Sequence, residues 1–462
     1  MQILGSSNVE IVSVIDLRDA YHTLRLDKES QQYCGVTPYY GSPTYIYLRL
    51  AMGLSPSPAI WQNFIDRVLD EIPERKHHLA IMDDVLIHSD FASHMQHLVN
   101  LFKALIKNGL KISPKKCQLF RKELIYMGHT IIIQAHGACI TAHKSNVDPI
   151  LEMKPPTTAT GCKSFCGMVN FLAMYLPKLQ ELLRPIYRLT KKGVVFEWTT
   201  ECQENFDKIK SLLVKPPILS MPKKIGRYLM VSDTSKVACG ATLYQFQQGA
   251  YRIVGYLSKS LPEPASRYTI SELELLGLVV NMAQAQHLLR NVEFDVIVDH
   301  SALVHIVRGK REPPTLRIKK LLELLRGFSF YLWYMKGKEM KITDFLSRNP
   351  TDGGKDADKI IPISFNYNDD EYGRAFHIGE YDTFHSEQLY DTLLQGRIHV
   401  CQLCKEEEEW NSILKWFQGS LKYFTRSKAA AQGVKMPSVA PFASEQNQAP
   451  QQIGRASCRE RV

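Results

Sequence analysis

Two adjacent carboxylates, Asp83 and Asp84, lie between two short apolar runs, Leu79 to Met82 and Val85 to Ile87. Apolar runs separated by a short polar turn are typical of a β-hairpin, so the pattern predicts a hairpin that presents both acids at its turn. Because like charges at such close range repel each other, the arrangement favours a bound cation. An isolated pair of aspartates is also common in ordinary solvated turns, so this pair alone does not establish a metal site.

A third acid lies upstream of the pair. The run Ile11 to Ile15 is rich in β-branched residues and ends at Asp16, which predicts a short strand with a carboxylate at its end. The motifs IDLRDAYH, MGLSPSPAIWQ and IMDD then follow one another along the chain. In this order they resemble the palm of a reverse transcriptase, most closely that of gypsy-type LTR retrotransposons.

The resemblance implies metal-dependent nucleotide addition. It assigns Asp16 and Asp83 as the principal metal ligands and Asp84 as an accessory one. Two Mg²⁺ ions, or Mn²⁺ ions, held about 3.5–4 Å apart would activate the attacking oxygen and neutralise the leaving group. Mg²⁺ prefers oxygen ligands, which suits carboxylates. The chain departs from the family at Ile81, where the family usually has tyrosine, and we expect this change to affect primer positioning and not metal binding.

The same resemblance implies a nucleotide pocket. It places Tyr21 beneath the nucleotide sugar, where an aromatic ring would clash with a 2′-hydroxyl, although without the motif a core tyrosine would be an equally good interpretation. It also places Gly53 and Gln62 at the templating and nucleotide pocket. Because two prolines precede Ala59, a helix is predicted only from about that residue, which leaves Gly53 on a loop.

Downstream of the carboxylate pair, apolar residues recur at helical spacing over residues 90–109. A basic stretch follows, in which Lys115 and Lys116 would contact nucleic-acid phosphates. A solvated basic face is an equally good interpretation. The resemblance adds Met127 and Gly128, which match the family's hairpin that holds the primer end. These contacts would recognise a duplex by its shape and not by its sequence.

The pair Pro155-Pro156 marks a boundary. Beyond it, Cys162 to Leu189 and Glu201 to Val214 are helical in pattern. In order and spacing these segments resemble the thumb and connecting segment of gypsy-type polymerases, and we assign them no chemistry.

A second set of strands and helices begins at Tyr228. The predicted elements are a strand ending in Asp233, a strand from Ala238, a strand over 252–257, a helix over 271–289, a strand ending at Asp299, a further helix, and a strand over 328–335. Antiparallel strands followed by alternating helices and strands predict an RNase H fold. The order of motifs resembles the RNase H domain of the same retrotransposon family.

Four acids lie where that fold would need them: Asp233, Glu274, Asp299 and Asp344. The resemblance implies that they hold two Mg²⁺ ions, which activate a water to attack a phosphodiester. Each acid alone has a simpler explanation as a helix cap or a solvated helix residue. Glu272 competes with Glu274, but the ELLG that begins at Glu274 matches the family's ELLA.

Bulk composition is consistent with these assignments. With 462 residues and 45% apolar composition, the chain can form two or three domains with real cores. The formal charge of +10 suits a polyanionic partner. Ten scattered cysteines fit free thiols in a reducing compartment. The sequence contains no apolar run of the roughly 20 residues that a membrane span needs and no signal peptide pattern.

The predicted fold class is α/β (α+β): a truncated right-hand polymerase palm with thumb and connection helices, an RNase H-like domain and a disordered tail. We expect the chain to be a fragment of a longer polyprotein. The expected segments are a palm with truncated fingers (1–140), a thumb and connection (141–222), an RNase H-like domain (223–350), a tether towards a missing integrase (351–452), and a stretch resembling a translated sequencing adapter (453–462). Cys401 and Cys404 form a lone CxxC, for which free thiols fit better than zinc.

The sequence therefore predicts an RNA-directed DNA polymerase with RNase H activity. Its partners would be an RNA template, a DNA primer, an RNA–DNA hybrid and deoxynucleoside triphosphates, with no membrane. The location would be intracellular, either cytoplasmic in virus-like particles or nuclear. The alternative is a catalytically inactive remnant that serves as a nucleic-acid-binding or structural subunit.

Overall fold

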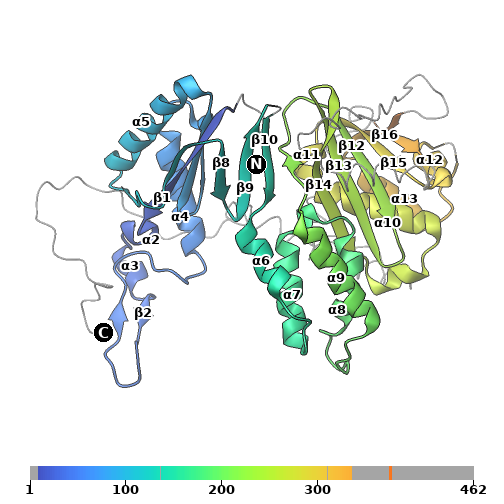
Figure 1. Ribbon diagram of the computed structural model, residues 1–462, viewed down its shortest axis with the longest axis horizontal. Helices are drawn as coiled ribbons and strands as arrows, with labels where there is room; N and C mark the ends of the chain where they lie inside the picture. Colours follow the sequence, from blue (N-terminus) through green and yellow to red (C-terminus); the bar gives the residue numbers. More distant parts are fainter. Residues whose placement is uncertain (1–8, 136, 310, 336–373, 377–462) are drawn as a thin grey trace, which may run out of the picture. The chain divides into compact units, whose positions relative to one another are not determined.

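The computed structural model describes residues 9–135, 137–309, 311–335 and 374–376. The chain divides into two compact units, of which the first runs to Tyr126 and the second begins at Met127. Both contain helices and sheets (Figure 1), so the predicted α/β class is confirmed.

The first unit is built on one antiparallel sheet. Its elements in chain order are β1 (Ile11–Arg18), α2 (Ala20–Thr23), α3 (Lys28–Gln31), β2 (Gly35–Val36), β3 (Tyr45–Ile46), α4 (Ser57–Asp70), the 3-10 helix η1 (Arg75–His77), β4 (His78–Ile81), β5 (Asp84–Ser89), α5 (Phe91–Lys107), β6 (Lys111–Ile112), β7 (Gln118–Arg121) and β8 (Glu123–Tyr126). The strand order of the sheet is β4-β5-β1-β6, and β7 also pairs with β1.

The predicted hairpin is present as β4 and β5, joined by a two-residue turn at Met82 and Asp83. The predicted strand before Asp16 is also present, but it was expected to end there and instead continues to Arg18. The reason is a second partner strand, because β6 pairs with Leu17 and Arg18.

Helices α4 and α5 supply most of the apolar core of this unit. Fully or almost fully buried side chains from both helices meet those of the central strands; examples are Trp61, Ile65, Leu69, Leu98, Leu101, Ile15, Val85 and Ile87. The predicted start of the first helix at Ala59 was two residues late, since α4 begins at Ser57. Pro58 lies in the first turn, where its missing N–H would have no helical partner, so the helix tolerates it.

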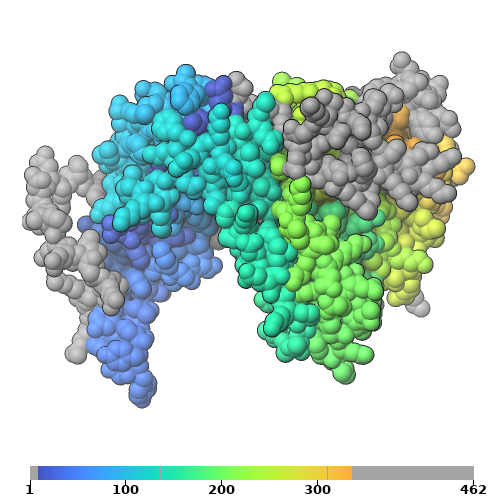
Figure 2. All heavy atoms as spheres, viewed as in Figure 1, coloured from blue at the N-terminus to red at the C-terminus, as the bar shows by residue number. Residues whose placement is uncertain are grey.

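A short hairpin, β2 and β3, extends away from the sheet of the first unit (Figures 1 and 2). Its neighbouring tyrosines Tyr39 and Tyr40 are exposed. The hairpin therefore presents aromatic side chains to solvent.

The second unit begins with a small antiparallel sheet and a group of helices. The strands β9 (His129–Gln134), β10 (Gly137–Ala142) and β11 (Leu219–Ser220) are adjacent in the order β11-β10-β9. The helical elements are α6 (Lys144–Glu152), α7 (Ala159–Phe171), the 3-10 helix η2 (Ala173–Tyr175), α8 (Leu179–Arg188) and α9 (Thr200–Val214). The rings of Phe165 on α7 and Phe206 on α9 lie 4.8 Å apart between centroids, and both are buried.

A larger mixed sheet follows in the same unit. Its elements are β12 (Tyr228–Thr234), β13 (Ala238–Gln247), β14 (Ala250–Ser260), the 3-10 helix η3 (Glu263–Arg267), α10 (Ile270–Gln284), α11 (Gln286–Leu289), β15 (Glu293–Val298), α12 (Ser301–Val307), α13 (Leu316–Leu325), β16 (Ser329–Tyr334) and β17 (Arg374–Phe376). The strand order is β14-β13-β12-β15-β16-β17. Strands β12, β13 and β14 are antiparallel, whereas β15 runs parallel to both β12 and β16.

Most of this arrangement is the one the sequence pattern predicted, but two of the predicted helices are divided. The helix predicted over 271–289 is α10 followed by the short α11. The single helix expected after Asp299 is two helices, α12 and α13. Glycine and prolines separate them in the sequence, and both residue types interrupt helices.

Helix α10 approaches β12 very closely at Gly277. A Cβ built on this glycine would lie 2.0 Å from Oγ1 and 2.9 Å from Cβ of Thr234. Because threonine is branched at Cβ and stiff at χ1, the clash cannot be relieved by moving a flexible chain end. The glycine therefore sets the distance between the helix and the strand.

We predict that Gly277→Ala lowers the free energy of unfolding, although alanine is the better helix former. Overpacking costs about 1–3 kcal/mol, which exceeds the gain of about 1 kcal/mol from replacing a helical glycine. In a Thr234→Ala background the contacts with Oγ1 and Cγ2 are gone and only the 2.9 Å contact with the Cβ of residue 234 remains, so the same substitution should cost less. Denaturant unfolding of wild type, the two single variants and the double variant measures the free energy of unfolding of each protein. If the effects of the two substitutions simply add, the proposed contact between residues 277 and 234 is contradicted.

Candidate active sites

The strand register brings the three palm carboxylates together. In the pairing of β1 with β5, Asp16 lies opposite Asp84, and the backbone N–H of Leu17 donates to the carbonyl of Asp83 at 2.8 Å. Asp83 lies in the turn directly before Asp84. All three acids predicted from the sequence therefore lie at one end of this strand pair.

The electrostatics at this cluster disfavour three free carboxylates. Burial raises the pKa of Asp83, and the charges of Asp84 and Asp16 raise it further. Burial and Asp16 likewise raise the pKa of Asp84. Lys116 opposes both shifts, and its Nζ lies 3.3 Å from Oδ2 of Asp16. Oδ1 of Asp83 is buried without a hydrogen-bond partner, so the cluster suits a divalent cation.

The turn that carries Asp83 is held from behind by α4. The indole Nε1 of Trp61 donates to the carbonyl of Met82 at 2.7 Å. The side-chain amide of Gln62 donates to the carbonyl of Ala80 at 3.0 Å and accepts from the N–H of Met82 at 3.0 Å. Since both ends of the Gln62 amide are engaged with the hairpin backbone, its role in the structure is to position the turn.

Trp61 is the contributor that the sequence interpretation missed. It is fully buried, and its bond to Met82 holds a backbone with a positive φ of 54°. Trp61 lies within the motif MGLSPSPAIWQ, but a tryptophan in a predicted helix is normally a core residue. Its indole N–H, which needs an acceptor when buried, was the only sign of a polar contact.

The remaining predicted pocket residues lie around the same turn. The hydroxyl of Tyr21 on α2 is 3.5 Å from Sδ of Met82, and its ring centroid is 6.0 Å from that of Trp61. Burial raises the pKa of Tyr21, and so does the nearby charge of Asp83. Gly53 has a φ of 89°, with open space where a Cβ would lie, so backbone conformation and not crowding requires glycine there.

The predicted primer residues fall in different surroundings. Lys115 and Lys116 are both exposed, and Lys116 forms an ion pair with Asp16. Met127 and Gly128 both have positive φ values, 51° and 78°. The carbonyl of Gly128 accepts from Nδ2 of Asn146 at 2.7 Å, and a Cβ on this glycine would meet that same atom at 2.7 Å. The positive φ of residue 128, more than the movable end of the Asn146 side chain, therefore favours glycine at this turn.

A second group of acids converges in the larger sheet. Because β12 and β15 are parallel neighbours, the acids at their carboxyl ends, Asp233 and Asp299, lie at the same edge. Glu274 projects to them from α10. The residue is 6% exposed, and burial, followed by the charges of Asp299 and Asp233, raises its pKa to about 8. The pKa of Asp299 is raised by burial and by Asp233.

The structure separates Glu274 from its competitor Glu272. Glu272 forms a capping box with Thr269 at the start of α10 and accepts from Thr315 at 3.0 Å and from Arg317 at 2.9 Å. Its carboxylate is therefore fully used in fixing the helix start. By contrast, Oε2 of Glu274 is buried without a hydrogen-bond partner, which fits a cation ligand. Asp344 lies outside the described residues, as do Cys401, Cys404 and the expected tail apart from β17, which pairs with β16.

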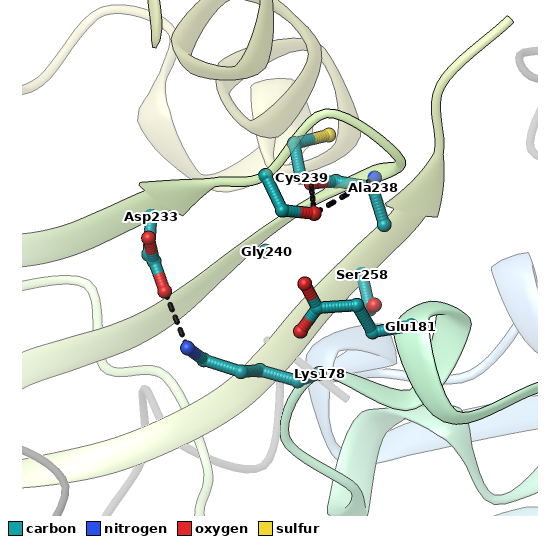
Figure 3. A pocket seen from close by; sticks show the side chains of 8 residues that line it. Lys178, Glu181, Asp233, Ala238, Cys239, Gly240 and Ser258 are labelled. Atoms are coloured by element: carbon teal, nitrogen blue, oxygen red, sulfur yellow. Dashed lines mark hydrogen bonds and ion pairs between the residues drawn. The ribbon is translucent and has the colours of Figure 1, made fainter. Parts of the chain in front are cut away.

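A lysine from the preceding helical segment reaches the second group. Lys178 precedes α8, and its ammonium forms an ion pair with Asp233 (Figure 3). Bonds from the N–H of Gln180 to Ser258 and from Ser260 to Oε1 of Gln180, both 3.0 Å, hold the start of α8 against β14. The lysine is thus positioned by its own helix start, and sequence reasoning gave no signal for it.

Comparisons with known proteins agree with this division. Residues 4–131 match the family model described as reverse transcriptase (RNA-dependent DNA polymerase), and residues 198–296 match the RNase H-like domain found in reverse transcriptase. The chain is 30% identical over 351 residues to the Transposon Tf2-3 and Tf2-4 polyproteins of Schizosaccharomyces pombe. The match covers 75% of this chain but only 26% of those relatives, so the chain spans about a quarter of their length.

Solved structures show the same fold. The foamy viral protease-reverse transcriptase in complex with an RNA/DNA hybrid superposes with a TM-score of 0.59 and 22% identity, covering 73% of this chain and 45% of that one. Its dRH form in complex with double-stranded DNA gives the same score over 72% of this chain and 58% of that one. None of the helices in the described part of the chain has the length and apolar character that a membrane crossing requires.

We predict that Lys178→Met increases divalent-metal affinity at the second group of acids. The ammonium of Lys178 and a metal ion compete for the Asp233 carboxylate. Loss of an exposed ion pair of this strength should raise the affinity for the metal by about two- to five-fold. Titration calorimetry with Mn²⁺ in an Asp83→Asn background measures it without a contribution from the palm. Lys191→Met is the matched control, because Lys191 pairs with Glu263, away from the acids. Unchanged or weaker binding in Lys178→Met would contradict the competition.

Proposed function

The chain carries the reverse transcriptase and RNase H-like domains of an LTR-retrotransposon polyprotein, and from this premise we propose that it copies RNA into DNA and degrades the RNA strand of the resulting hybrid. The observation that supports this most is the convergence of Asp16, Asp83 and Asp84 at one end of a strand pair. A second convergence, of Asp233, Glu274 and Asp299, supports the nuclease.

In the polymerase site, Asp16 and Asp83 would hold two Mg²⁺ or Mn²⁺ ions, with Asp84 as the accessory ligand. Such ions supply activation of the attacking hydroxyl and neutralisation of the leaving phosphate. The chain's own contribution is geometric. Trp61 and Gln62 hold the turn so that Asp83 keeps its orientation, and Lys116 partly balances the carboxylate charge until a cation arrives.

Deoxynucleotide selection would rest on Tyr21 and the loop at Gly53. Contacts with Met82 and Trp61 orient the Tyr21 ring beside the turn, so a ribose 2′-hydroxyl would meet a ring that has little freedom to move. Lys115, Lys116, Met127 and Gly128 remain proposed contacts for the primer and template. We propose an RNA template, a DNA primer and deoxynucleoside triphosphates as substrates.

In the nuclease site, Asp233, Glu274, Asp299 and, by family resemblance, Asp344 would hold the second pair of Mg²⁺ ions. Glu274 is the residue that most needs them, because burial and two neighbouring charges keep its pKa near 8. A bound divalent cation favours the ionised form and makes the carboxylate available as a ligand at neutral pH. The proposed substrate is an RNA–DNA hybrid, recognised by groove shape and 2′-hydroxyls.

The proposed location is intracellular, in the cytoplasm or the nucleus. The described cysteines all carry free thiols, which suits a reducing compartment. Burial raises the pKa of Cys166 and Cys239 to about 12, so these two thiols are inert core residues.

The nuclease assignment predicts Mg²⁺-dependent cleavage of the RNA strand of a hybrid. Asp233→Asn should lower the cleavage rate by about 100-fold or more, because it removes a charge that acts at the reacting phosphate. The exposed Asp148→Asn on α6 is the matched control and should cleave normally. Gel analysis of a strand-labelled hybrid measures the rate. Salt-sensitive hybrid binding without any turnover would instead support the inactive, nucleic-acid-binding alternative.

The polymerase assignment predicts primer extension on an RNA template. Asp83→Asn should lower extension by about 100-fold or more while leaving hybrid cleavage intact, and Asp233→Asn should do the reverse. Asp70→Asn, which removes only an exposed ion pair with Arg75, is the palm control. Extension that is equal in wild type and Asp83→Asn would exclude this carboxylate cluster as the polymerase site.

A further inference from the structure

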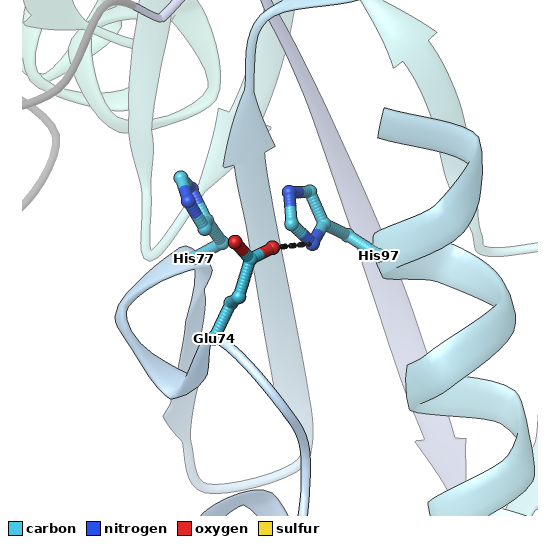
Figure 4. A group of neighbouring side chains, drawn as sticks. All are labelled: Glu74, His77 and His97. Atoms are coloured by element: carbon cyan, nitrogen blue, oxygen red, sulfur yellow. Dashed lines mark ion pairs between the residues drawn. The ribbon is translucent and has the colours of Figure 1, made fainter. Parts of the chain in front are cut away.

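A third cluster of metal-ligating side chains lies at the opposite end of the β4–β5 hairpin from the palm carboxylates. Glu74, just before η1, His77 at the end of η1 and His97 on α5 point toward one another (Figure 4). One possible ligand atom from each lies within 4.8 Å of the other two. Strands of this length separate the two ends of the hairpin by roughly 10–15 Å, so the cluster does not belong to the polymerase site.

The side chain of His97 is almost fully buried but lacks a hydrogen-bond partner at one nitrogen. It is 2% exposed, and Nδ1 has no such partner. The nearest acid is Glu74, whose Oε2 lies 3.4 Å from that Nδ1. A buried polar atom without a partner costs about 1–3 kcal/mol, so this nitrogen is poised for a ligand.

His77 is held in the tautomer that a metal ligand needs. Its Nδ1 lies 2.9 Å from the carbonyl oxygen of His88. Because a carbonyl can only accept, Nδ1 must carry the proton, which leaves the lone pair on Nε2. A metal-binding histidine is commonly oriented in just this way, by donating its other N–H to a backbone carbonyl.

The charge state of the cluster also suits a cation. Burial and the charge of His77 lower the pKa of His97. Among the surrounding charges, Glu74 and Asp90 favour a bound cation and Lys76 opposes one. The cluster therefore combines one carboxylate with two imidazoles, a set of donors that divalent transition metals accept.

We propose that Glu74, His77 and His97 bind one Zn²⁺ ion, with a water molecule as the fourth ligand. Zinc accepts two histidines and a glutamate in four-coordinate geometry, in which bonds of about 2.0–2.2 Å place neighbouring ligand atoms about 3.4 Å apart. The separation of Glu74 and His97 already matches this spacing. His77 lies in a short surface helix and has only to move toward the other two. Mg²⁺ would be a poor competitor, since it prefers oxygen ligands.

The ion would connect two segments that the polymerase chemistry does not touch. Glu74 precedes η1 and His77 is its last residue; η1 leads directly into β4, and His97 lies on the helix that covers β5. A zinc bridge would therefore fix the outer end of the hairpin whose inner end carries Asp83 and Asp84. Its effect would be on stability, because none of the three ligands faces the carboxylates.

Zinc binding is measured on the full chain, freed of metal by a chelator and then supplied with millimolar Mg²⁺ to occupy the carboxylate sites. Competition with a chromophoric chelator should show one tight zinc site. His77→Gln and Glu74→Gln change residues of the surface segment and should fold, and each should weaken zinc binding by about 100-fold or more. Zinc should raise the melting temperature of wild type and not of these variants.

Two controls separate a zinc site from simpler explanations. Glu71→Gln removes another link between this segment and α5, the 3.0 Å ion pair with Lys107, without touching a proposed ligand. His22→Gln removes an exposed histidine elsewhere in the same unit. Both should bind zinc as wild type does. Asp83→Asn should also keep the zinc site, so failure of the polymerase proposal and failure of this one are distinguishable.

Cobalt substitution identifies the ligand type. Co²⁺ at this site should give visible d–d absorption without the near-ultraviolet thiolate charge-transfer band that cysteine ligands produce. Equal zinc affinity in wild type, His77→Gln and Glu74→Gln would overturn the proposal. A thiolate spectrum would overturn it as well, because the zinc would then be held by cysteines.

Discussion

Repulsion between carboxylates is the constraint on which both candidate sites depend. Each site gathers acids closer together than their charges favour and withdraws them partly from water, and the raised pKa values of Asp83, Asp84, Glu274 and Asp299 express that cost. Such sites persist because the surrounding fold is stable enough to hold them. A lysine relieves part of the cost in each case, Lys116 at Asp16 and Lys178 at Asp233. Both lysines are largely exposed, so they can yield to a more highly charged cation.

The two sites meet this constraint with different architecture. In the palm, adjacent strands suffice, because register alone sets Asp16 opposite Asp84 and the turn adds Asp83. In the larger sheet, the acids come from two strands and a helix, so their convergence depends on how α10 lies on β12. The close approach at Gly277 is what sets that geometry. A change of a few tenths of an ångström in the distance between α10 and β12 would therefore displace the acids of the second site far more than those of the first.

Much of this could be predicted from the sequence, for a physical reason. Hairpins and strands are encoded locally, so Asp16, Asp233 and Asp299 could be assigned to particular strands and Asp83 to a hairpin turn, although β1 continues beyond Asp16. What could not be predicted depends on contacts between distant segments. The bond from Trp61 to Met82, the reach of Lys178 to Asp233 and the contact between Gly277 and Thr234 join residues 21, 55 and 43 positions apart, and no local pattern encodes such distances. Local rules also misplaced the start of α4, since proline is excluded from a helix interior but not from its first turn.

The hairpin of β4 and β5 shows why long-range contacts matter for a site that register alone seems to define. Register fixes which residues face each other, but a short hairpin with a two-residue turn can still move as a rigid unit relative to the rest of the domain. Trp61 and Gln62 restrain its inner end, where Asp83 lies. At its outer end, His94 forms hydrogen bonds with the hydroxyl of Ser13 at 2.7 Å and with that of Ser89 at 2.8 Å. These two bonds join α5 to both β1 and β5. Burial lowers the pKa of His94 to about 4, so this link is a neutral hydrogen-bonded one at pH 7. The carboxylates can therefore be held against their repulsion because the strands that carry them are secured at both ends by helices that contribute no acid to the site.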